Sequence, residues 1–344
     1  MSEIPAATKV LITGASGYIG SQLAEELAAR KLPVRCLVRK TSRVARLSEL
    51  GCELAYGDIT DYGAVLQAVD GMDLVFHVAG VTAALDVRHK LSVNRTGTAN
   101  VARACAEQSR PPRHIYVSSV SAVGPGEAHG ARSSDVQRTP VSYYGHSKKL
   151  GEIEAEKFAD RVPTVIVRPG VVFGDGNREM LPVFQTIDRL GCHVVPGFCP
   201  PQLSLVYIHD LIEILLLASQ SAGTIAPAPA DGGPGRGYYF AAADEYPDYW
   251  QLGRLIQQAL GRPRVIPIYF PELTSWFLGL LSDAVSRMRG TPAHLSVDKI
   301  RDAMVPSWAC STTTLRDELQ FYPSQTLLEQ LRCTVAWYRE HEWL

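Results

Sequence analysis

The sequence predicts an α/β fold in which a doubly wound parallel sheet is followed by a smaller, mostly helical C-terminal lobe. Over the first half of the chain, short β-branched runs alternate with helical patterns, and a glycine-rich segment joins the first run to the first helix. Apolar strands separated by such helices imply a parallel sheet that is covered on both faces. After Gly174 this alternation ends and Pro and Gly become frequent, which predicts the second lobe.

The expected strands are rich in Val, Ile and Leu, and they span 9–13, 34–38, 53–56, 74–78, 114–118 and 164–168. Between them, helical patterns cover 18–30, 43–50, 61–69, 90–108 and 143–160. Later helices are expected over 178–190, 210–219, 248–260, 272–288 and 325–340, and the segments 205–219 and 238–241 are expected to return to the main sheet. Because doubly wound sheets bind ligands at the carboxyl ends of their strands, the site is expected there.

Composition excludes several classes of protein. The 34 Lys and Arg residues nearly balance 35 Asp and Glu, which gives a net charge of -1 and no sign of a nucleic-acid partner. The first residues hold no positive region followed by a long apolar core, and every apolar run is much shorter than the roughly 20 residues of a membrane span. Seven scattered cysteines without C-x-x-C spacing favour a reduced, cytoplasmic protein with no metal site.

The segment T-G-A-S-G-Y-I-G at 13–20 follows the first expected strand and precedes the first expected helix. Glycine lets the backbone turn tightly and approach a pyrophosphate, while the start of the helix offers free N–H groups. This context predicts a Rossmann-type site for a dinucleotide. The residues expected to contact the cofactor here are Gly14, Ser16, Gly17, Tyr18, Ile19 and Gly20.

Basic residues follow the second expected strand, where an acidic residue would bind a ribose 2′-hydroxyl. Arg39, with Lys40 or Arg43 nearby, can instead pair with a 2′-phosphate. A solvated basic loop is the alternative. The sequence therefore favours NADP(H) as cofactor and keeps NAD(H) as the second candidate.

Two further strand ends carry candidate cofactor contacts. Asp58, followed by Ile59, comes after the third strand, and its carboxylate can accept a hydrogen bond from an adenine amino group. The alternative for Asp58 is a helix N-cap for 60–69. Val78, Ala79 and Gly80 follow the fourth strand, where small residues leave room for the adenosine ribose.

Tyr144 and Lys148 stand near the start of the helix expected over 143–160. Side chains at i and i+4 lie on one helical face, and an ammonium near a phenol favours the phenolate. Ser118 and Ser119, at the end of the fifth strand, can share a substrate oxygen with Tyr144. Tyr143 lacks a lysine four residues later, so Tyr144 is the expected acid–base residue.

Together these segments resemble the extended short-chain dehydrogenase/reductase family. The resemblance covers nearly the whole chain and rests on ordered motifs: T-G-x-x-G-x-x-G at 13–20, H-x-A-G at 77–80, N-x-x-G-T at 94–98, V-S-S at 117–119, Y-x-x-x-K at 144–148, R-P-G-x-V-x-G at 168–174 and Y-I-H-D-L at 207–211.

The resemblance implies a role for each matching residue. Tyr144 would donate or accept the proton, Lys148 would lower its pKa and hold the nicotinamide ribose, and Ser119 would hold the substrate oxygen, with Ser118 as the fallback. Asn94 would support a water relay behind the lysine, or would only stabilise the helix that begins near 95. The segment expected beside the nicotinamide carboxamide consists of Arg168, Pro169, Gly170 and Val171.

On this basis the chain divides into two parts. Residues 1–175 with about 203–242 are expected to form the NAD(P)-binding Rossmann domain. Residues of about 176–202 and 243–344 are expected to form the substrate-binding lobe.

The substrate lobe departs from the sugar-nucleotide branch of the family. Leu203 stands where that branch carries an arginine for the diphosphate, and Val171 stands where it carries an asparagine. The chain therefore looks most like the 3β-hydroxysteroid dehydrogenase-like and dihydroflavonol-reductase-like branches. We expect an NADP-dependent oxidoreductase of a hydrophobic secondary alcohol or ketone. The alternatives are a sugar-nucleotide epimerase or dehydratase and a non-catalytic redox sensor, and an intact catalytic set argues against the sensor.

Two expectations concern surfaces. The apolar helix over 272–288 is expected to face the core, with a lid over the substrate or a patch on a membrane surface as alternatives. A homodimer is expected through the helices over 90–108 and 143–160, as in related enzymes. The apolar face that motivates this expectation consists of Val93, Val101, Ala104, Cys105, Leu150 and Ile153.

Overall fold

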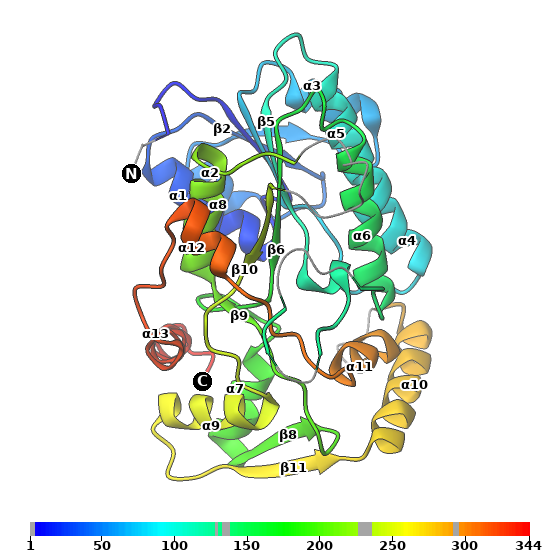
Figure 1. Cartoon of the computed structure of the whole chain (residues 1–344), viewed down its shortest axis with the longest axis vertical. Helices are drawn as coiled ribbons and strands as arrows, with labels where there is room; N and C mark the ends of the chain where they lie inside the picture. Colours follow the sequence, from blue (N-terminus) through cyan, green and yellow to red (C-terminus); the bar gives the residue numbers. More distant parts are fainter. Residues whose placement is uncertain (1–3, 128–129, 133–137, 226–235, 292–295) are drawn as a thin grey trace.

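The computed structural model describes the chain except residues 1–3, 128–129, 133–137, 226–235 and 292–295. Its centre is a seven-stranded parallel sheet with the strand order β10-β6-β5-β4-β1-β2-β3, and the segments 181–196, 249–289 and 297–303 gather at one end of this sheet (Figure 1). The predicted doubly wound α/β class is confirmed. The strands of the sheet are β1 (Val10–Thr13), β2 (Val34–Val38), β3 (Glu53–Tyr56), β4 (Leu74–His77), β5 (Arg113–Val117), β6 (Thr164–Pro169) and β10 (Tyr238–Ala241).

Helices cover both faces of this sheet. They are α1 (Tyr18–Ala29), α2 (Ala45–Glu49), α3 (Tyr62–Val69), α4 (Val87–Leu91), α5 (Thr98–Ala106), α6 (Tyr143–Glu156) and α8 (Ile208–Gln220). Alternate strand residues face opposite sides: Ile12 packs with α1 and α8, whereas Leu11 packs with α3 and α5. The strands are apolar on both faces because both faces are buried.

The helix expected over 90–108 is not α-helical throughout. Between α4 and α5 lies a π-helical turn over Ser92–Gly97 (η1), which contains Asn94. A short 3₁₀ turn over Val120–Val123 (η2) follows the end of β5. Single π turns inside helices are rare and are frequently found at functional sites.

The sequence patterns missed several of the elements outside the main sheet. The elements of this part of the chain are β7 (Val171–Phe173), α7 (Leu181–Leu190), β8 (Cys192–Pro196), β9 (Leu205–Tyr207), α9 (Tyr249–Leu260), β11 (Ile266–Phe270), α10 (Glu272–Arg289), α11 (Val297–Ala303), α12 (Thr313–Leu319) and α13 (Leu327–Glu340). The expected return of 238–241 to the main sheet is confirmed by β10, which pairs with β6. The expectation for 205–219 is corrected: β9 pairs with β7 in a separate two-stranded sheet, while α8 covers the main sheet.

The apolar helix over 272–288 forms as expected, but it does not face the core. On α10 the buried residues are Ser275, Gly279 and Ser286, while Phe277 is 65% exposed. The small residues let α10 lie close to α11, because a Cβ atom at Gly279 would come 2.3 Å from Ile300 Cδ1. The expectation of a core-facing helix is therefore wrong, and the large apolar side chains point to the surface.

Candidate functional site

A cleft of about 1040 Å³ lies at the carboxyl ends of the central strands, between the sheet and the second lobe. Its walls come from the loops after β1, β2, β3, β4, β5 and β6 on one side. The other side is formed by residues of the lobe, among them Tyr249 on α9 and Asp302 on α11. The location agrees with the rule that doubly wound sheets bind ligands where their strands end.

The glycine loop between β1 and α1 lines this cleft with Gly14, Ser16, Gly17, Tyr18, Ile19 and Gly20. Gly14 has a φ of +75°, and a Cβ atom there would lie 2.6 Å from the backbone nitrogen of Ala79. Gly17 caps α1 without a side-chain hydrogen bond. The first N–H groups of α1 thus stay available for an anion, so this loop fits the pyrophosphate of a dinucleotide.

Arg39 lies at one end of the cleft and is exposed, with its backbone held by the Ser42 hydroxyl. Lys40 and Arg43 are also exposed, but they do not line the cleft. Asp58 and Ile59 line it as expected. Of the candidate cations after β2, only Arg39 is thus placed to meet a ligand.

Asp58 is not the cap of the helix that follows. Asp61 caps α3 by accepting hydrogen bonds from Gly63 and Ala64, whereas Asp58 accepts from the backbone and hydroxyl of Thr60. Burial opposes ionisation of Asp58, but the bonds from Thr60 and the charge of Arg39 lower the pKa of its carboxyl below the ordinary value. The carboxylate is thus an acceptor at neutral pH, which leaves the ligand contact as its remaining expected role.

The loop after β4 brings Val78, Ala79 and Gly80 to the cleft. Asn94 holds this loop in place: its amide accepts from Val81 N at 2.8 Å and donates to Val81 O at 3.0 Å. The same amide donates to the Ser147 hydroxyl at 2.8 Å. Asn94 is fully buried and its side chain joins η1 to the β4 loop and α6, so its function is wider than stabilising a helix that begins near 95.

Tyr144 stands in the first turn of α6, which Ser142 caps through Gly145 N. Its phenol lies near the Ser119 hydroxyl, which acts to lower the phenol pKa and itself accepts from Ser121 N at 3.2 Å. Ser118 also lines the cleft, but its hydroxyl donates to Glu152 Oε1 at 2.7 Å. The structure thus pairs Ser119, and not the neighbouring serine, with the expected acid–base residue.

Lys148 is fully enclosed one turn further along α6. Its ammonium donates to the Val117 carbonyl at 2.7 Å and lies 4.5 Å from the centre of the Tyr116 ring. Burial lowers the pKa of Lys148 to about 7, and burial raises the pKa of Tyr144 to about 12. The expected lowering of the phenol pKa by Lys148 is therefore not found: burial dominates, and Ser119 is the group that acts to lower it.

The expectation for Arg168 is also corrected. Its guanidinium is 0% exposed and pairs with Glu152 at 2.8 Å and 2.9 Å, so it does not line the cleft. Pro169, Gly170 and Val171 do line it. Arg168 lies in β6, and successive strand residues point to opposite faces, which turns this side chain toward α6.

The substrate end of the cleft contains residues that sequence reasoning missed, beside Leu203, which it had singled out. Apolar walls come from Met180, Leu203, Tyr249 and Trp308, with carboxyl groups from Glu179, Asp298 and Asp302 among them. Burial raises the pKa of Asp302 to about 7. Apart from Leu203, no local signal marks these positions, because they lie outside the motifs.

The cleft in this fold defines an oxidoreductase of the extended short-chain dehydrogenase/reductase type. The model of the NAD dependent epimerase/dehydratase family matches residues 10–227, and the chain belongs to this family. Among the curated relatives is a ceramide reductase of Caulobacter vibrioides, 28% identical, with 97% of this chain and 96% of the relative covered. A 2-alkyl-3-oxoalkanoate reductase of Stenotrophomonas maltophilia is also 28% identical, with 94% and 97% covered.

Solved structures share the whole fold. The structure of gox2253 has a TM-score of 0.76 at 23% identity, covering 97% of this chain and 99% of the other. The UDP-glucose 4-epimerase of Thermotoga maritima has a TM-score of 0.75 at 18% identity, covering 97% and 100%. At these identities the likeness shows the fold alone.

The described residues include neither a candidate metal-binding group nor a candidate membrane-spanning helix. No group of three or more His, Cys, Asp or Glu residues within the described ranges could hold a metal ion. No helix in that part of the chain is long and apolar enough to span a membrane.

The burial of Lys148 predicts a distinct pH dependence of stability. Between about pH 7 and 10.5, the ordinary pKa of a lysine, the unfolded chain keeps a proton that the folded protein releases. The unfolded state then binds more protons, so the free energy of unfolding rises with pH by on the order of 1 kcal/mol per unit from this group. Urea titrations at about pH 7 and about pH 9 measure this rise. Lys148→Met removes this contribution. Equal slopes of the free energy of unfolding against pH in the two proteins would therefore contradict the prediction.

Proposed function

We propose that this protein is an NADP(H)-dependent oxidoreductase that interconverts an apolar secondary alcohol and its ketone. The observation that carries the proposal is that Ser119 and Tyr144 lie near each other in one cleft whose substrate end has apolar walls. Leu203 and Trp308 belong to those walls and are both nearly fully buried, so the substrate end offers an apolar surface. Pockets of this kind bind apolar ligands and orient them with few polar groups.

The side chains have separate tasks in this proposal. Bound nicotinamide supplies or accepts the hydride. The hydroxyls of Ser119 and Tyr144 hold the substrate oxygen, and Tyr144 gives or takes its proton. Lys148, fixed by the Val117 carbonyl, contributes charge beside the nicotinamide ribose and beneath the phenol. Asn94 acts through Ser147 and the β4 loop, and so positions α6 against the cofactor end of the cleft.

The activities for which the relatives are named support an apolar carbonyl substrate. They include reduction of a ceramide, reduction of a 2-alkyl-3-oxoalkanoate, and a 3β-hydroxysteroid dehydrogenase/isomerase of Mycobacterium tuberculosis. The sugar-nucleotide enzymes resemble the chain in fold. However, Leu203 lines the cleft at the position where the sugar-nucleotide branch carries an arginine for the diphosphate. An apolar side chain cannot pair with a diphosphate.

Replacing Tyr144 with Phe tests the proposed chemistry. General acid–base catalysis contributes about 10²–10⁴-fold, so Tyr144→Phe should lose turnover of that order in kcat and in kcat/KM. NADPH affinity should stay unchanged, because the hydroxyl is directed to the substrate oxygen. The measurement follows NADPH oxidation with apolar ketones, steroid ketones and UDP-glucose in parallel. Turnover of UDP-glucose with no activity on any ketone would overturn the proposed substrate class.

Tyr143→Phe is the matched control. Tyr143 precedes Tyr144 on α6, but its ring is 48% exposed and stacks with the Arg301 guanidinium outside the cleft. We expect this variant to keep nearly full activity. If Tyr143→Phe were as inactive as Tyr144→Phe while both bound cofactor, the assignment of the tyrosine would be wrong.

Arg39 should determine the choice of cofactor. A charge-assisted bond from its guanidinium to a 2′-phosphate contributes about 1.5–3 kcal/mol, so NADP(H) should bind at least roughly tenfold more tightly than NAD(H). In Arg39→Ala the two affinities should become equal. Lys40→Ala is the control, since Lys40 does not line the cleft. Calorimetric titration of both cofactors measures the difference, and equal affinities in the unchanged protein would refute it.

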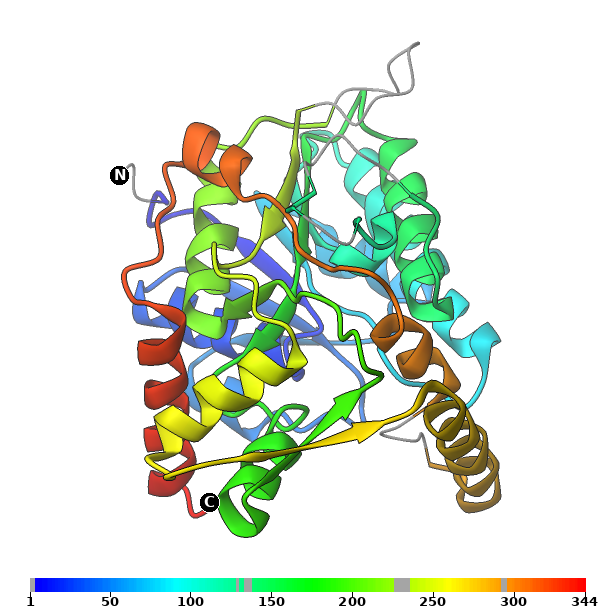
Figure 2. The ribbon, with the colours of Figure 1, turned by 60° about the horizontal axis from the view of Figure 1, so that its bottom comes forward.

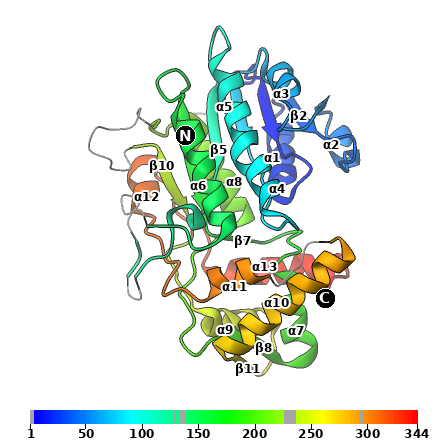
Figure 3. The same ribbon diagram turned by 90° about the vertical axis from the view of Figure 1, so that its right-hand side faces the viewer.

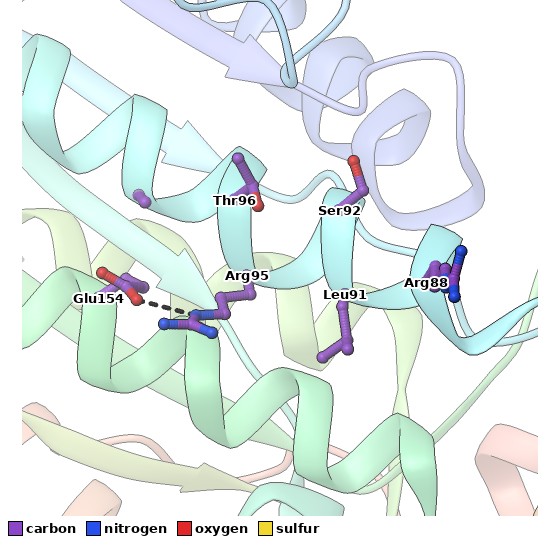
Figure 4. Close-up of a pocket in the computed structure, with 7 residues that line it drawn as sticks. Arg88, Leu91, Ser92, Arg95, Thr96 and Glu154 are labelled. Atoms are coloured by element: carbon purple, nitrogen blue, oxygen red, sulfur yellow. Dashed lines mark hydrogen bonds and ion pairs between the residues drawn. The ribbon is translucent and has the colours of Figure 1, made fainter.

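A homodimer is also proposed, through a surface that differs from the expected one. Val101, Ala104 and Cys105 are fully buried against the sheet, so they cannot contact a partner. The outer sides of η1 and α6 instead present a shallow depression of about 460 Å³, crossed by an ion pair between Arg95 and Glu154 (Figure 4). Its lining residues are Arg88, Leu91, Ser92, Arg95, Thr96, Ala99 and Glu154.

Light scattering at micromolar concentration should return about twice the chain mass of 37.6 kDa. Ile153 precedes Glu154 on α6 and is 38% exposed, and Ile153→Arg should shift the mass to that of the monomer. A charge without a partner is costly in the centre of an interface. A monomer in the unchanged protein would reject the homodimer.

A further inference from the structure

Helix α10 buries small residues and exposes large apolar ones, whereas a surface helix usually buries its large apolar residues. The exposed side chains lie on one face at helical spacing and comprise Leu273, Phe277, Leu280, Leu281 and Met288. Leu281 is the least exposed of them at 52%, and Leu273 the most at 85%. We call these five residues the α10 stripe. The opposite face, with Ser275 and Gly279, packs on α11.

A second apolar face adjoins this helix. Strand β11 runs through Pro271 directly into α10 at the outer end of the lobe (Figure 2). Val194 on β8 pairs with Ile268 on β11, and both are exposed, as is Ile266. Tyr269 follows Ile268 and therefore points to the other side of this sheet, where the exposed Phe198 ring stacks on it at 5.9 Å between ring centres. We call Val194, Ile266 and Ile268 the β8–β11 face.

So many large exposed side chains on neighbouring elements are uncommon on a soluble monomer and mark a surface that meets an apolar partner. In Figures 1 and 3 α10 lies along the margin of the lobe, beside α11. Among the described residues, nothing covers the α10 stripe. The surface is therefore available to a partner from outside the chain.

The charges around this surface favour an anionic partner. Arg287 and Arg289 stand in the last turn of α10, and Arg264 precedes β11; all three are exposed. The acidic residues of α10 lie off the stripe and are already engaged. Glu272 accepts from Trp276 Nε1, and Asp283 accepts from Val297 N. A helix with an apolar face, aromatic residues and flanking arginines is typical of binding at a lipid interface.

One helix separates the α10 stripe from the cleft. Helix α11 packs on Gly279 through Ile300 and contributes Asp298, Lys299 and Asp302 to the lining of the cleft. A partner that holds α10 therefore lies next to the substrate end. An apolar substrate of the proposed class partitions into lipid, so it would have only a short path from a bilayer to Tyr144.

We propose that the α10 stripe and the β8–β11 face dock the protein on the surface of an anionic lipid bilayer, without spanning it. The inference rests on the proposed function for the substrate, while the docking itself rests on the exposed side chains and the arginines. The apolar side chains enter the headgroup region and the arginines pair with lipid phosphates. The bilayer then serves as the reservoir from which substrate reaches the cleft.

Flotation with vesicles tests the docking. The full chain is mixed with vesicles of phosphatidylcholine alone, or of phosphatidylcholine and phosphatidylglycerol in equal parts. It should float with the mixed vesicles. Phe277→Glu/Leu281→Glu should lower the partition coefficient at least about tenfold, because two large apolar contacts are lost. Arg287→Gln/Arg289→Gln should lower binding to the mixed vesicles only, to the level of pure phosphatidylcholine.

Tyr322→Glu is the matched control. Tyr322 is 65% exposed, the same fraction as Phe277, and it follows α12, which lies away from α10 in all three views. This variant should float like the unchanged protein. A second measurement needs no charged variant: Trp276 emission should be quenched by brominated lipid in mixed vesicles, and Trp276→Phe should remove that part of the quenching.

Three results would overturn the docking. They are failure of the unchanged protein to float with mixed vesicles, equal flotation of the Phe277/Leu281 variant, and a fall in oligomeric mass of that variant with no vesicle binding by either protein. The last would assign the surface to a second copy of the chain. Reduction of a short, water-soluble ketone without vesicles reports on the proposed function separately. The Phe277/Leu281 variant should keep that activity, so loss of docking and loss of chemistry are distinguished.

Discussion

The buried ion pair between Glu152 and Arg168 fixes helix α6 against β6. Both side chains are fully enclosed, and Glu152 also accepts from Ser118 at the end of β5. Burial alone would raise the pKa of Glu152, but the charge and hydrogen bonds of Arg168 keep it lowered. A pair of this kind stabilises mainly through what its loss would leave behind, which is an uncompensated charge in a dry interior.

The remaining chemistry follows from this placement of α6. Tyr144, Lys148 and Glu152 are spaced by four residues, so they share one helical face. Each of them faces the end of β5 or the residues just after it: Glu152 bonds to Ser118, Lys148 bonds to the Val117 carbonyl, and Tyr144 lies near Ser119. The same face is buried, and this is why desolvation dominates the pKa values of both Tyr144 and Lys148. The positions of Tyr144 and Lys148 and the shifts of their pKa values therefore both follow from the burial of this face of α6.

The sequence could predict the parts of this protein that depend on local spacing. The strands over 34–38 and 53–56, the glycine loop and the four-residue spacing from Tyr144 to Lys148 all follow from near neighbours in the chain. The parts that failed depend on distant contacts. Arg168 was expected beside a ligand because nothing near it in the sequence shows that β6 will place it against Glu152 of α6. The same limit applies to α10, where the periodicity shows an apolar stripe and cannot show which side the neighbours cover.

The π-helical turn over Ser92–Gly97 has a consequence for how this chain tolerates change in length. Such turns contain one more residue than an α-helical turn, so everything after the insertion is rotated by about 100° relative to a regular helix. Here the extra residue allows Asn94 to reach Val81 and Ser147 while α5 still buries Val101 and Cys105 on the sheet. Loss of one residue from this turn would leave a regular α-helix. Either the Asn94 amide or the apolar face of α5 would then point in the wrong direction. The segment is therefore a place where a deletion would be more harmful than most substitutions.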